Sequence, residues 1–396
     1  MRILIELYDK ATPINNVITG LAMKPDLIAF IGDDSLSEPR VQRSIQRTFG
    51  QALPEVRFDW RICADASFEA ACSALQDILD TYGDDQCVVD VTGGAEYLLL
   101  AVGRLYDRRA VPVVTFRPSR NRFEWLLGSG KVVPDWQPPR FSAAQTIAMS
   151  GGELLSSHRW TDLFADPALL GAVPKLFQVC RRNAADWRQF VQFFQQLDEP
   201  QDPAALYHAP LTVTSGTRSI RVPDGVLREL YAAGILLHLQ LGTASCEFQL
   251  VYPALSACLA DVGMILELYM YKMLTDCGLY DAVEMCGVVS WDNDDDPDNN
   301  VQNEIDLIAT AGISQYLISC KTGAVDNTTL NEIAELAHRF GNGYATPVLV
   351  SLRNIRASMP ALTMRADEMG IVLITGNDFE PEQLRRRLSS LAHTRK

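Results

Sequence analysis

Two carboxylates and a lysine in the last third of the chain have the types and spacing of a metal site. The run Asn303-Glu304-Ile305-Asp306 supplies the carboxylates, and Lys321 follows Asp306 after fourteen intervening residues. Two adjacent strands joined by a short turn would bring Asp306 and Lys321 together. Carboxylate oxygens are the hard ligands that Mg²⁺ and Mn²⁺ prefer, and such a metal lowers the pKa of a bound water. A lysine adds a cation that stabilises a transition state or orients a nucleophile.

A third carboxylate lies upstream on an apolar segment. Glu267 is the only acid between Met264 and Met270, within a long predicted helix, Leu255 to Leu274. A carboxylate on so apolar a helix costs free energy unless it has a partner. We expect Glu267 to complete an acidic cluster with Asp306. The alternative is a core carboxylate paired to a lysine or tyrosine.

The strand carboxylates and the lysine also have a simpler interpretation. Glu304 and Asp306 lie on one predicted strand, so at least one of them could face water, and Lys321 could cap a strand end. The residues alone leave both interpretations open.

A second group of polar residues follows three predicted strands near the N-terminus. These are Tyr8-Asp9, Gly32-Asp33-Asp34-Ser35 and the run from Asp90 to Gly94. In open α/β sheets the carboxyl ends of the strands form the ligand crevice, so these segments should converge. In Thr92-Gly93-Gly94, two glycines before a helix let backbone N–H groups approach an anion. A tight turn that binds nothing is an equally good interpretation.

The common phosphate-binding fingerprints are missing from the sequence. GxGxxG does not occur, and Gly128-Ser129-Gly130-Lys131 lacks the first glycine of a P-loop and is followed by Val132. A dehydrogenase or a nucleoside triphosphatase is therefore disfavoured.

The elements that would position the N-terminal group form an alternating pattern. Short β-branched runs alternate with amphipathic stretches, which predicts a Rossmann-like α/β domain with a parallel sheet. The predicted strands are Ile3 to Leu7, Leu27 to Ile31, Val56 to Trp60, Cys87 to Val91 and Val111 to Phe116. The predicted helices are Val41 to Phe49, Ser67 to Tyr82 and Glu96 to Tyr106.

The middle of the chain is predicted to be mostly helical, and the last part is again α/β. Predicted middle helices are Gln145 to Leu155, Asp162 to Leu170, Lys175 to Cys180 and Trp187 to Leu197, with short strands at Arg218 to Val222 and Glu247 to Val251. The last part has predicted strands at Ala282 to Trp291, Glu304 to Ala309, Tyr316 to Cys320, Val348 to Ser351 and Ile371 to Ile374, and a helix from Leu330 to Phe340.

Composition excludes several classes of protein. The chain has 396 residues, which is too many for one ordinary core. Of these residues 47% are hydrophobic, which is too large a share for a disordered protein. A net charge of −14 disfavours non-specific coating of nucleic acid, so any chemistry on nucleic acid needs a local site. Nine cysteines without a CxxC pair fit a reducing compartment. The start lacks a signal-peptide pattern and no stretch is long and apolar enough to span a membrane, so we expect a cytoplasmic protein.

The order of the residues in the last part resembles the restriction-endonuclease-like nucleases of the PD-(D/E)xK superfamily. Gly263 to Glu267 is similar to their helix acid, Asn303 to Asp306 to their metal-binding strand, and Lys321 matches the motif's lysine. Ser319 differs, because most of the superfamily carries Asp or Glu at that place.

The resemblance implies a catalytic set and a metal set. It gives a Mg²⁺ or Mn²⁺ site at Asp306 and Glu267, with Glu304 able to supply the ligand that Ser319 does not. Lys321 would assist the attacking water, and Ser319 would orient water or substrate.

The N-terminal part has a second resemblance. Asp90 to Tyr97 is similar to the Thr-Gly-Gly-Thr-Lys signature of the CRISPR-associated Rossmann fold, CARF. The sequence departs at Ala95 and Glu96, where Thr and Lys are usual, so one positive contact to a ligand phosphate is lost. Thr92 and the glycine N–H groups remain.

Together the two parts resemble the CARF-fused ancillary nucleases of type III CRISPR systems. This implies a CARF-like domain at 1–135, a helical or mixed linking subdomain at 136–254 and a restriction-endonuclease-like α/β domain at 255–396. It also implies a homodimer that binds a cyclic oligoadenylate, cyclic tetra-adenylate being the expected one, at its two-fold axis. The implied ligand contacts are Tyr8, Asp9, Gly32, Asp33, Ser35, Thr92, Gly93 and Gly94. Tyr8 could contact an adenine or merely cover the sheet edge.

Three functions remain open at this point. The first is a metal-dependent nuclease that cuts DNA or RNA when a cyclic oligoadenylate binds. The second is a cyclic-oligoadenylate sensor whose nuclease-like domain is weak or inactive, which the Ser319 departure favours. The third is a metabolic enzyme on the Rossmann domain, which the missing GxGxxG disfavours.

Overall fold

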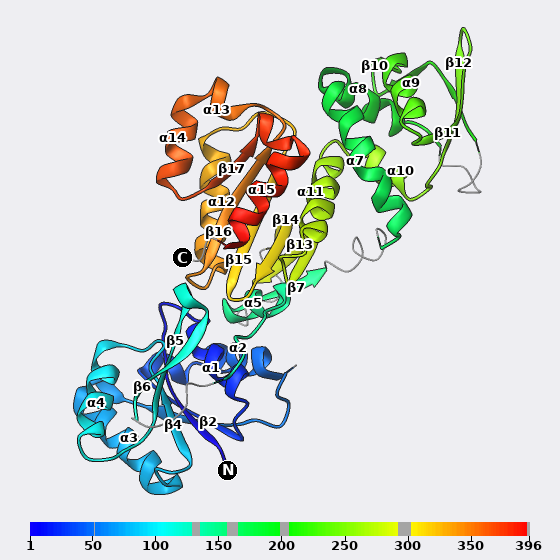
Figure 1. The fold of residues 1–396 in the computed structure, drawn as a ribbon. Helices are drawn as coiled ribbons and strands as arrows, with labels where there is room; N and C mark the ends of the chain where they lie inside the picture. The colour runs from blue at the N-terminus through cyan, green and yellow to red at the C-terminus, as the bar shows by residue number, and fades with distance from the viewer. Residues whose placement is uncertain (51, 129–134, 157–164, 199–205, 292–301, 394–396) are drawn as a thin grey trace.

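The computed structural model describes residues 1–50, 52–128, 135–156, 165–198, 206–291 and 302–393. Figure 1 shows these residues as three units. The N-terminal unit, blue to cyan, lies at one end, a sheet from the C-terminal part lies in the centre, and a green unit from the middle of the chain lies at the other end.

The N-terminal unit is a mostly parallel sheet with helices on both faces. Its strand order is β3-β2-β1-β4-β5-β6, with parallel pairs throughout except the antiparallel pair of β5 and β6. The strands are β1 (Ile3–Leu7), β2 (Leu27–Gly32), β3 (Arg57–Ile62), β4 (Cys87–Asp90), β5 (Val113–Arg117) and β6 (Arg122–Leu127). The helices are α1 (Asn15–Met23), α2 (Pro39–Gly50), α3 (Phe68–Tyr82) and α4 (Glu96–Tyr106). The predicted Rossmann-like fold is confirmed.

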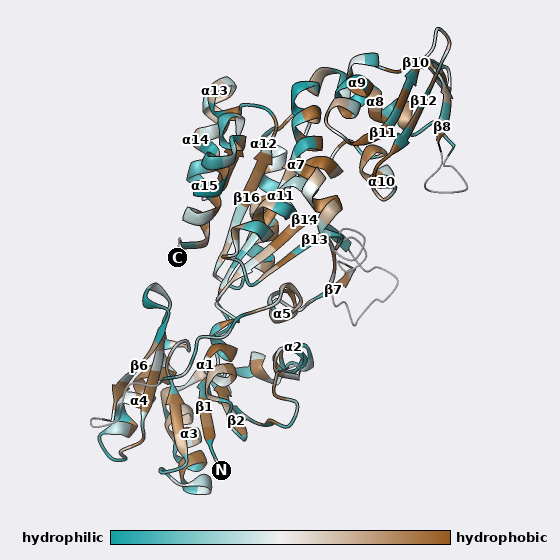
Figure 2. Ribbon diagram, turned by 45° about the vertical axis from the view of Figure 1, so that its right-hand side comes forward, coloured by the Kyte–Doolittle hydropathy of each residue, from teal (hydrophilic) through white to brown (hydrophobic). Residues whose placement is uncertain are grey.

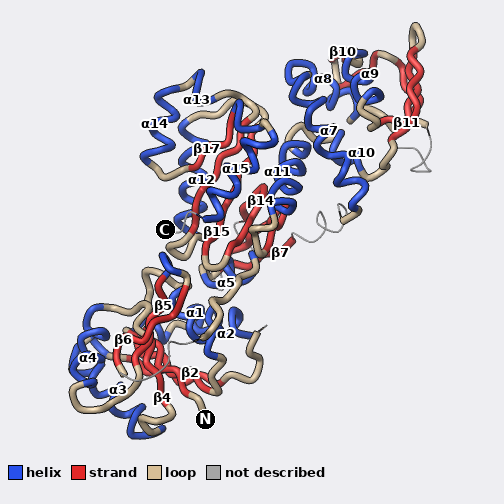
Figure 3. The backbone as a smooth tube through the Cα atoms, in the orientation of Figure 1, coloured by secondary structure: helices blue, strands red, loops and turns tan. Residues whose placement is uncertain are grey.

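Continuous apolar runs explain why helices cover both faces of this sheet. Strands β1 and β2 are buried along their whole length, and a strand that hides both faces must be sandwiched between helices. Two separate cores result, one under α3 and α4 and the other under α1 and α2. Figure 3 shows helices on both sides of the N-terminal strands, and Figure 2 shows the strands of the large sheets as mostly hydrophobic.

The central unit is a second six-stranded sheet of mixed direction. Its order is β17-β16-β15-β14-β13-β7, antiparallel from β7 to β15 and parallel from β15 to β17. The strands are β7 (Gly152–Ser156), β13 (Ala282–Trp291), β14 (Gln302–Ala311), β15 (Ser314–Lys321), β16 (Ala345–Ser351) and β17 (Val372–Thr375). The helices are α5 (Ala143–Met149), α11 (Met264–Cys277), α12 (Asn327–Phe340), α13 (Ile355–Ser358), α14 (Pro360–Glu368) and α15 (Pro381–His393).

The middle unit packs against the central sheet through a shared core. Its helices are α7 (Pro167–Arg182), α8 (Ala184–Phe194), α9 (Asp224–Ala232) and α10 (Leu255–Leu259). Its strands are β8 (Tyr207–Pro210), β9 (Thr212–Ser215), β10 (Arg218–Arg221), β11 (Leu236–Leu241) and β12 (Ser245–Leu250). Phe177 of α7 stacks on Tyr269 of α11 with ring centroids 3.8 Å apart. One buried cluster includes residues from α7 to α15 and joins the two units.

The helix predicted from Gln145 to Leu155 is wrong beyond Met149. Ser142 and Gln145 form a capping box that begins α5, and Gly151, with a φ of 77°, reverses the chain after it. The next residues form β7, which pairs with β13. Part of the predicted linking subdomain thus completes the central sheet. The first residues of the predicted helix Asp162 to Leu170 lie outside the described residues.

The long helix predicted from Leu255 to Leu274 is two helices. The first ends at Leu259, and Asp261 then accepts hydrogen bonds from the N–H groups of Gly263 (2.7 Å) and Met264 (3.3 Å). These two local bonds satisfy amide groups at the start of α11 and interrupt the predicted single helix. Glu267 therefore lies in the first turn of a new helix and not in the middle of a long one.

Candidate functional site

The hairpin of β14 and β15 brings Asp306 next to the end of β15. The register pairs Leu307 with Ile318, which sets Asp306 opposite Ser319. Asp306 Oδ2 accepts hydrogen bonds from the Cys320 N–H at 2.6 Å and from the Ser319 hydroxyl at 3.3 Å. The two-residue turn at Gly312, with a φ of 59°, joins the two strands as predicted.

Lys321 is the last residue of β15 and lies within electrostatic reach of Asp306. Burial raises the pKa of Asp306, and the Cys320 N–H bond and the Lys321 charge oppose that rise. Both side chains are only partly exposed. The structure thus brings Asp306, Lys321 and Ser319 together.

Glu267 approaches the same place from α11. Burial, followed by the charge of Asp306, raises the pKa of Glu267 to about 8. Its Oε2 accepts a hydrogen bond from the Cys286 thiol at 3.4 Å. The expected coupling of Glu267 to Asp306 is therefore present. Among the described residues, the side chain that donates to this carboxylate is therefore a cysteine, and not the lysine or tyrosine of the alternative interpretation.

Glu304 contributes less than its neighbour on β14. Its side chain is exposed, and its charge is a minor cause of the raised pKa of Glu267. Across the described residues, no three His, Cys, Asp or Glu side chains are arranged to hold a metal ion. The acid-rich run from Asp292 to Asp298 lies outside the described residues.

The donor set at Asp306 and Glu267 nevertheless fits a hard divalent cation. Both carboxylates are largely buried and repel each other, so a cation between them would relieve the electrostatic cost. Mg²⁺ keeps several waters in proteins and is commonly bound through one or two carboxylates, which is the number that this site offers.

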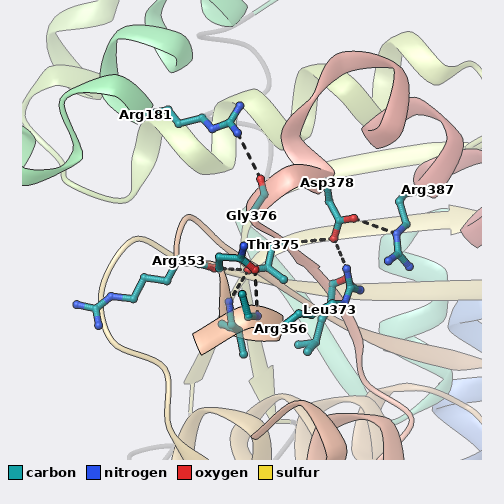
Figure 4. A network of polar contacts seen from close by, with 11 residues as sticks. Arg181, Arg353, Arg356, Leu373, Thr375, Gly376, Asp378 and Arg387 are labelled. Carbon is teal, nitrogen blue, oxygen red and sulfur yellow. Dashed lines mark hydrogen bonds and ion pairs between the residues drawn. The ribbon is translucent and has the colours of Figure 1, made fainter. Parts of the chain in front are cut away.

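An ion-pair network fixes the strand ends beside Lys321. The registers align Lys321 with Ser351 and Ser351 with Thr375, so β15, β16 and β17 end at one edge. Just past that edge, Asp378 pairs with Arg356 at 2.6 Å and with Arg387 at 3.2 Å (Figure 4). Asp378 is buried and also accepts a bond from the Thr375 N–H. Arg387 is thus part of the framework that holds these strand ends.

At the N-terminal edge, Asp9 acts as a loop cap. Its Oδ1 accepts from the N–H groups of Ala11 and Thr12, both at 2.9 Å, and its Oδ2 accepts from Asn15 at 2.9 Å. A Cβ on Gly93 would lie 2.7 Å from the same Oδ2, so the glycine loop packs directly on this carboxylate. Asp9 and Gly93 are brought together as predicted, in a contact that already occupies the Asp9 oxygens.

The residues after β2 meet Tyr8 at the same edge. A Cβ on Gly32 would lie 2.7 Å from the Tyr8 Cβ, and Tyr8 is buried. Asp33 accepts hydrogen bonds from both the N–H and the hydroxyl of Ser35. These bonds cap a short 3₁₀ helix, Asp34–Ser37. Burial raises the pKa of Tyr8, and the nearby Ser35 hydroxyl lowers it.

Thr92 and Gly94 shape the turn after β4. The Thr92 hydroxyl donates to Asp90 at 2.7 Å and accepts from the Phe116 N–H at 2.7 Å, and Gly94 has a φ of 101°. The three segments therefore converge, as expected for strand ends of one sheet. Of the candidate ligand contacts, four already make structural hydrogen bonds: Asp9, Asp33, Ser35 and Thr92.

Gly94→Ala is expected to destabilise this edge by about 1–3 kcal/mol, because an L side chain is strained at that φ and its Cβ would lie 2.7 Å from the Leu7 Cβ. Hydrogen exchange of peptides from β1 and β4 would measure the loss. The control is Gly103→Ala on the exposed face of α4, where an added Cβ contacts nothing and should stabilise the helix by about 0.5–1 kcal/mol. Equal exchange rates in the two variants would show that neither the φ of Gly94 nor its contact with Leu7 requires a glycine.

Two features of these edges escaped the sequence analysis. Glu6 of β1 and Asp90 of β4 are neighbours in the ladder and are both fully buried. Burial and then the charge of Asp90 raise the pKa of Glu6 well above its ordinary value, and burial raises the pKa of Asp90 to about 6. An acid inside the apolar run Ile3–Leu7 was the available signal. The second feature, the bond from the Cys286 thiol to Glu267, had no signal in the sequence, because it depends on a contact between β13 and α11.

Comparison with known proteins supports the architecture. Residues 258–393 match the family model of the Card1-like endonuclease domain. The solved structure of protein VC1899 from Vibrio cholerae is similar over 100% of this chain and 98% of that chain, with a TM-score of 0.74 and 17% identity. Can2 from Sulfobacillus thermosulfidooxidans, solved in complex with cyclic tetra-adenylate, is similar over 99% of both chains, with a TM-score of 0.64 and 16% identity. No curated protein matches the sequence.

These matches confirm the predicted fold class and the predicted resemblance. The chain has an N-terminal Rossmann-like sheet and a C-terminal domain that matches the Card1-like endonuclease model, and its fold is similar to that of Can2 over 99% of both chains. At these identities the likeness to the solved structures concerns the fold. None of the helices in the described ranges is long and apolar enough to cross a membrane.

Proposed function

We propose that this chain is a metal-dependent nuclease that hydrolyses phosphodiester bonds of DNA or RNA and is activated by a cyclic oligoadenylate. The observation that carries the proposal is the convergence of Asp306, Lys321 and Glu267 in the part of the chain that matches an endonuclease family. Such a nuclease would serve type III CRISPR antiviral defence.

Each residue of the site has a role that its surroundings support. Asp306 and Glu267 would hold Mg²⁺ or Mn²⁺, with Glu304 as a more exposed third ligand. When bound, the metal would supply charge stabilisation for the phosphodiester and a more acidic water. The cation of Lys321 would orient the attacking water and balance charge on the phosphate. The Ser319 hydroxyl, already bonded to Asp306, would hold that carboxylate or a substrate oxygen in place.

The N-terminal edge is the proposed ligand site. Its contacts would come from Tyr8, Asp9, Gly32, Asp33, Ser35, Thr92, Gly93 and Gly94. The support is their convergence and the fold shared with Can2, whose structure contains cyclic tetra-adenylate. A symmetric ligand suits an isologous homodimer. A near-complete switch would need the ligand to bind the active arrangement better by about 5.5 kcal/mol.

The direct test uses the purified full chain with Mn²⁺ and single- and double-stranded DNA and RNA, with and without cyclic tetra-adenylate. We expect cleavage of at least one substrate and a large increase in rate with the ligand. A rise in melting temperature with the ligand alone would report binding to the folded state, since it stabilises only that state. Absence of cleavage in every mixture, or full activity in Lys321→Ala, would contradict the proposal.

The second candidate function is a cyclic-oligoadenylate sensor with a weak or inactive nuclease-like domain. Ser319, where the related motif usually carries an acid, favours it. The substitution Ser319→Glu separates the two. New cleavage by this variant, with none by the unchanged chain, would support the sensor. Loss of an existing activity in the variant would favour the nuclease.

A further inference from the structure

The backbone of Cys286 is unusual for a residue in a strand. Its φ is 53°, in the left-handed region that L side chains seldom adopt, although β13 continues on both sides of it. The ladder to β14 pairs Met285 with Leu307 and Gly287 with Ile305, which places Cys286 level with Asp306. A non-glycine residue in such a conformation is strained, and such strain gathers at functional sites.

The conformation turns the thiol to the face that carries α11. Successive side chains in a strand normally point to opposite faces. Here Met285 and Cys286 are both buried in the same core, the one to which α11 contributes. The left-handed residue therefore breaks the alternation and places its sulfur against Glu267.

Both oxygens of the Glu267 carboxylate have close neighbours, one of them the Cys286 thiol. The thiol donates to Oε2 at 3.4 Å. On the other side, a Cβ on Gly263 would lie 3.1 Å from Oε1, so glycine at this position leaves room for the carboxylate where it lies. Glycine would suit position 286 better on backbone grounds, since it adopts a positive φ without strain. The cysteine adds a donor that glycine lacks.

We propose that Cys286 is a positioning residue, whose thiol holds the Glu267 carboxylate toward Asp306 for binding of the divalent metal. The inference rests on the proposed function, because it assigns Glu267 to the metal. Residues that orient a metal ligand by hydrogen bonding typically change metal affinity by about 10–100-fold when removed. Serine keeps a donor at this place, whereas alanine and glycine do not.

The test is Mn²⁺ binding to the full chain by titration calorimetry, without nucleic acid. Cys286→Ala is expected to raise the Kd for Mn²⁺ about tenfold, and Cys286→Ser to restore it to within about threefold. Cys286→Gly should also weaken Mn²⁺ binding while raising the melting temperature, because it relieves the strained backbone. If Cys286 had only a structural role, a substitution that raises the melting temperature would not also weaken Mn²⁺ binding. Cys246→Ala, a buried cysteine of β12, is the matched control and should leave the Kd unchanged.

The possible results separate this inference from the proposed function. If the unchanged chain binds Mn²⁺ and the alanine, serine and glycine variants bind it with the same Kd, the positioning role of Cys286 is overturned and the metal site is not. Equal weakening in the serine and alanine variants also overturns it, since the sulfur would then act by its size. Failure of the unchanged chain to bind Mn²⁺ overturns the metal site and the positioning role together.

Discussion

Asp306→Asn is expected to lower the rate of nucleic-acid cleavage about 10³-fold. Lewis-acid stabilisation by a metal is worth several kcal/mol in the transition state, and each 1.4 kcal/mol corresponds to a tenfold change in rate. The asparagine keeps an oxygen that can accept from the Cys320 N–H, which donates to Asp306 at 2.6 Å, so the end of β15 should stay folded. The loss would therefore report the missing charge.

The rate should be measured with saturating Mn²⁺ and cyclic tetra-adenylate on whichever substrate the unchanged chain cuts. Glu332→Gln, which removes an exposed carboxylate from α12, is the control and should cut at the unchanged rate. A Mn²⁺ Kd that rises in Asp306→Asn but not in Glu332→Gln would link the loss to the metal. Cleavage by Asp306→Asn within tenfold of normal would remove this carboxylate from the mechanism.

Glu6→Gln is expected to stabilise the N-terminal sheet at neutral pH. The Glu6 and Asp90 carboxyls face each other between β1 and β4 with both side chains fully buried. With both groups ionised, three of their oxygens, Glu6 Oε1 and Oε2 and Asp90 Oδ2, have no hydrogen-bond donor among the described residues. Ionising both groups in such a place is costly, and an amide at position 6 removes one charge and offers a donor to Asp90.

The sign of the pH dependence follows from the raised pKa values. A carboxyl whose pKa is higher in the folded chain binds its proton more tightly there, so folding is favoured at low pH and loses stability as pH rises. For Asp90 this loss begins near its ordinary pKa of 3.8 and is complete above about 6. The difference amounts to on the order of 3 kcal/mol. Glu6, whose pKa is raised well above 4.5, extends the loss to higher pH.

Hydrogen exchange of peptides from β1 and β4, compared between variants at equal pH, would check this prediction. We expect Glu6→Gln to exchange more slowly than the unchanged chain at pH 7 and at the same rate near pH 4. Glu55→Gln, at an exposed loop position of the same domain, should exchange as the unchanged chain does at both pH values. Faster exchange in Glu6→Gln at pH 7 would show that the carboxyl pair stabilises the sheet.

Periodicity in the sequence was sufficient to predict most of both large sheets. The apolar run Leu27 to Ile31 predicted a buried strand, and the observed strand extends it by one residue, Gly32. The spacing of Asp306 and Lys321 predicted a hairpin, and β14 and β15 form it. These features depend on neighbours in sequence, which is why sequence patterns reveal them.

Features that depend on distant contacts were not predictable in the same way. The apolar segment before Glu267 reads as one helix, and only the hydrogen bonds that Asp261 makes divide it. Residues 152–155 were predicted to end a helix, and the pairing with β13 makes them part of a strand. The conformation of Cys286 has no sequence signature, because cysteine seldom adopts a positive φ.

The pairing of β7 with β13 has a consequence for biosynthesis. β7 leaves the ribosome long before its partner, because the whole middle unit is translated between Ser156 and Ala282. At about 5–20 residues per second, the wait is on the order of ten seconds. During that time the nascent edge of β7 has no partner strand, so a chaperone or the already folded N-terminal unit would have to protect it from aggregation. Slowing translation within the middle unit should therefore lower the yield of native protein.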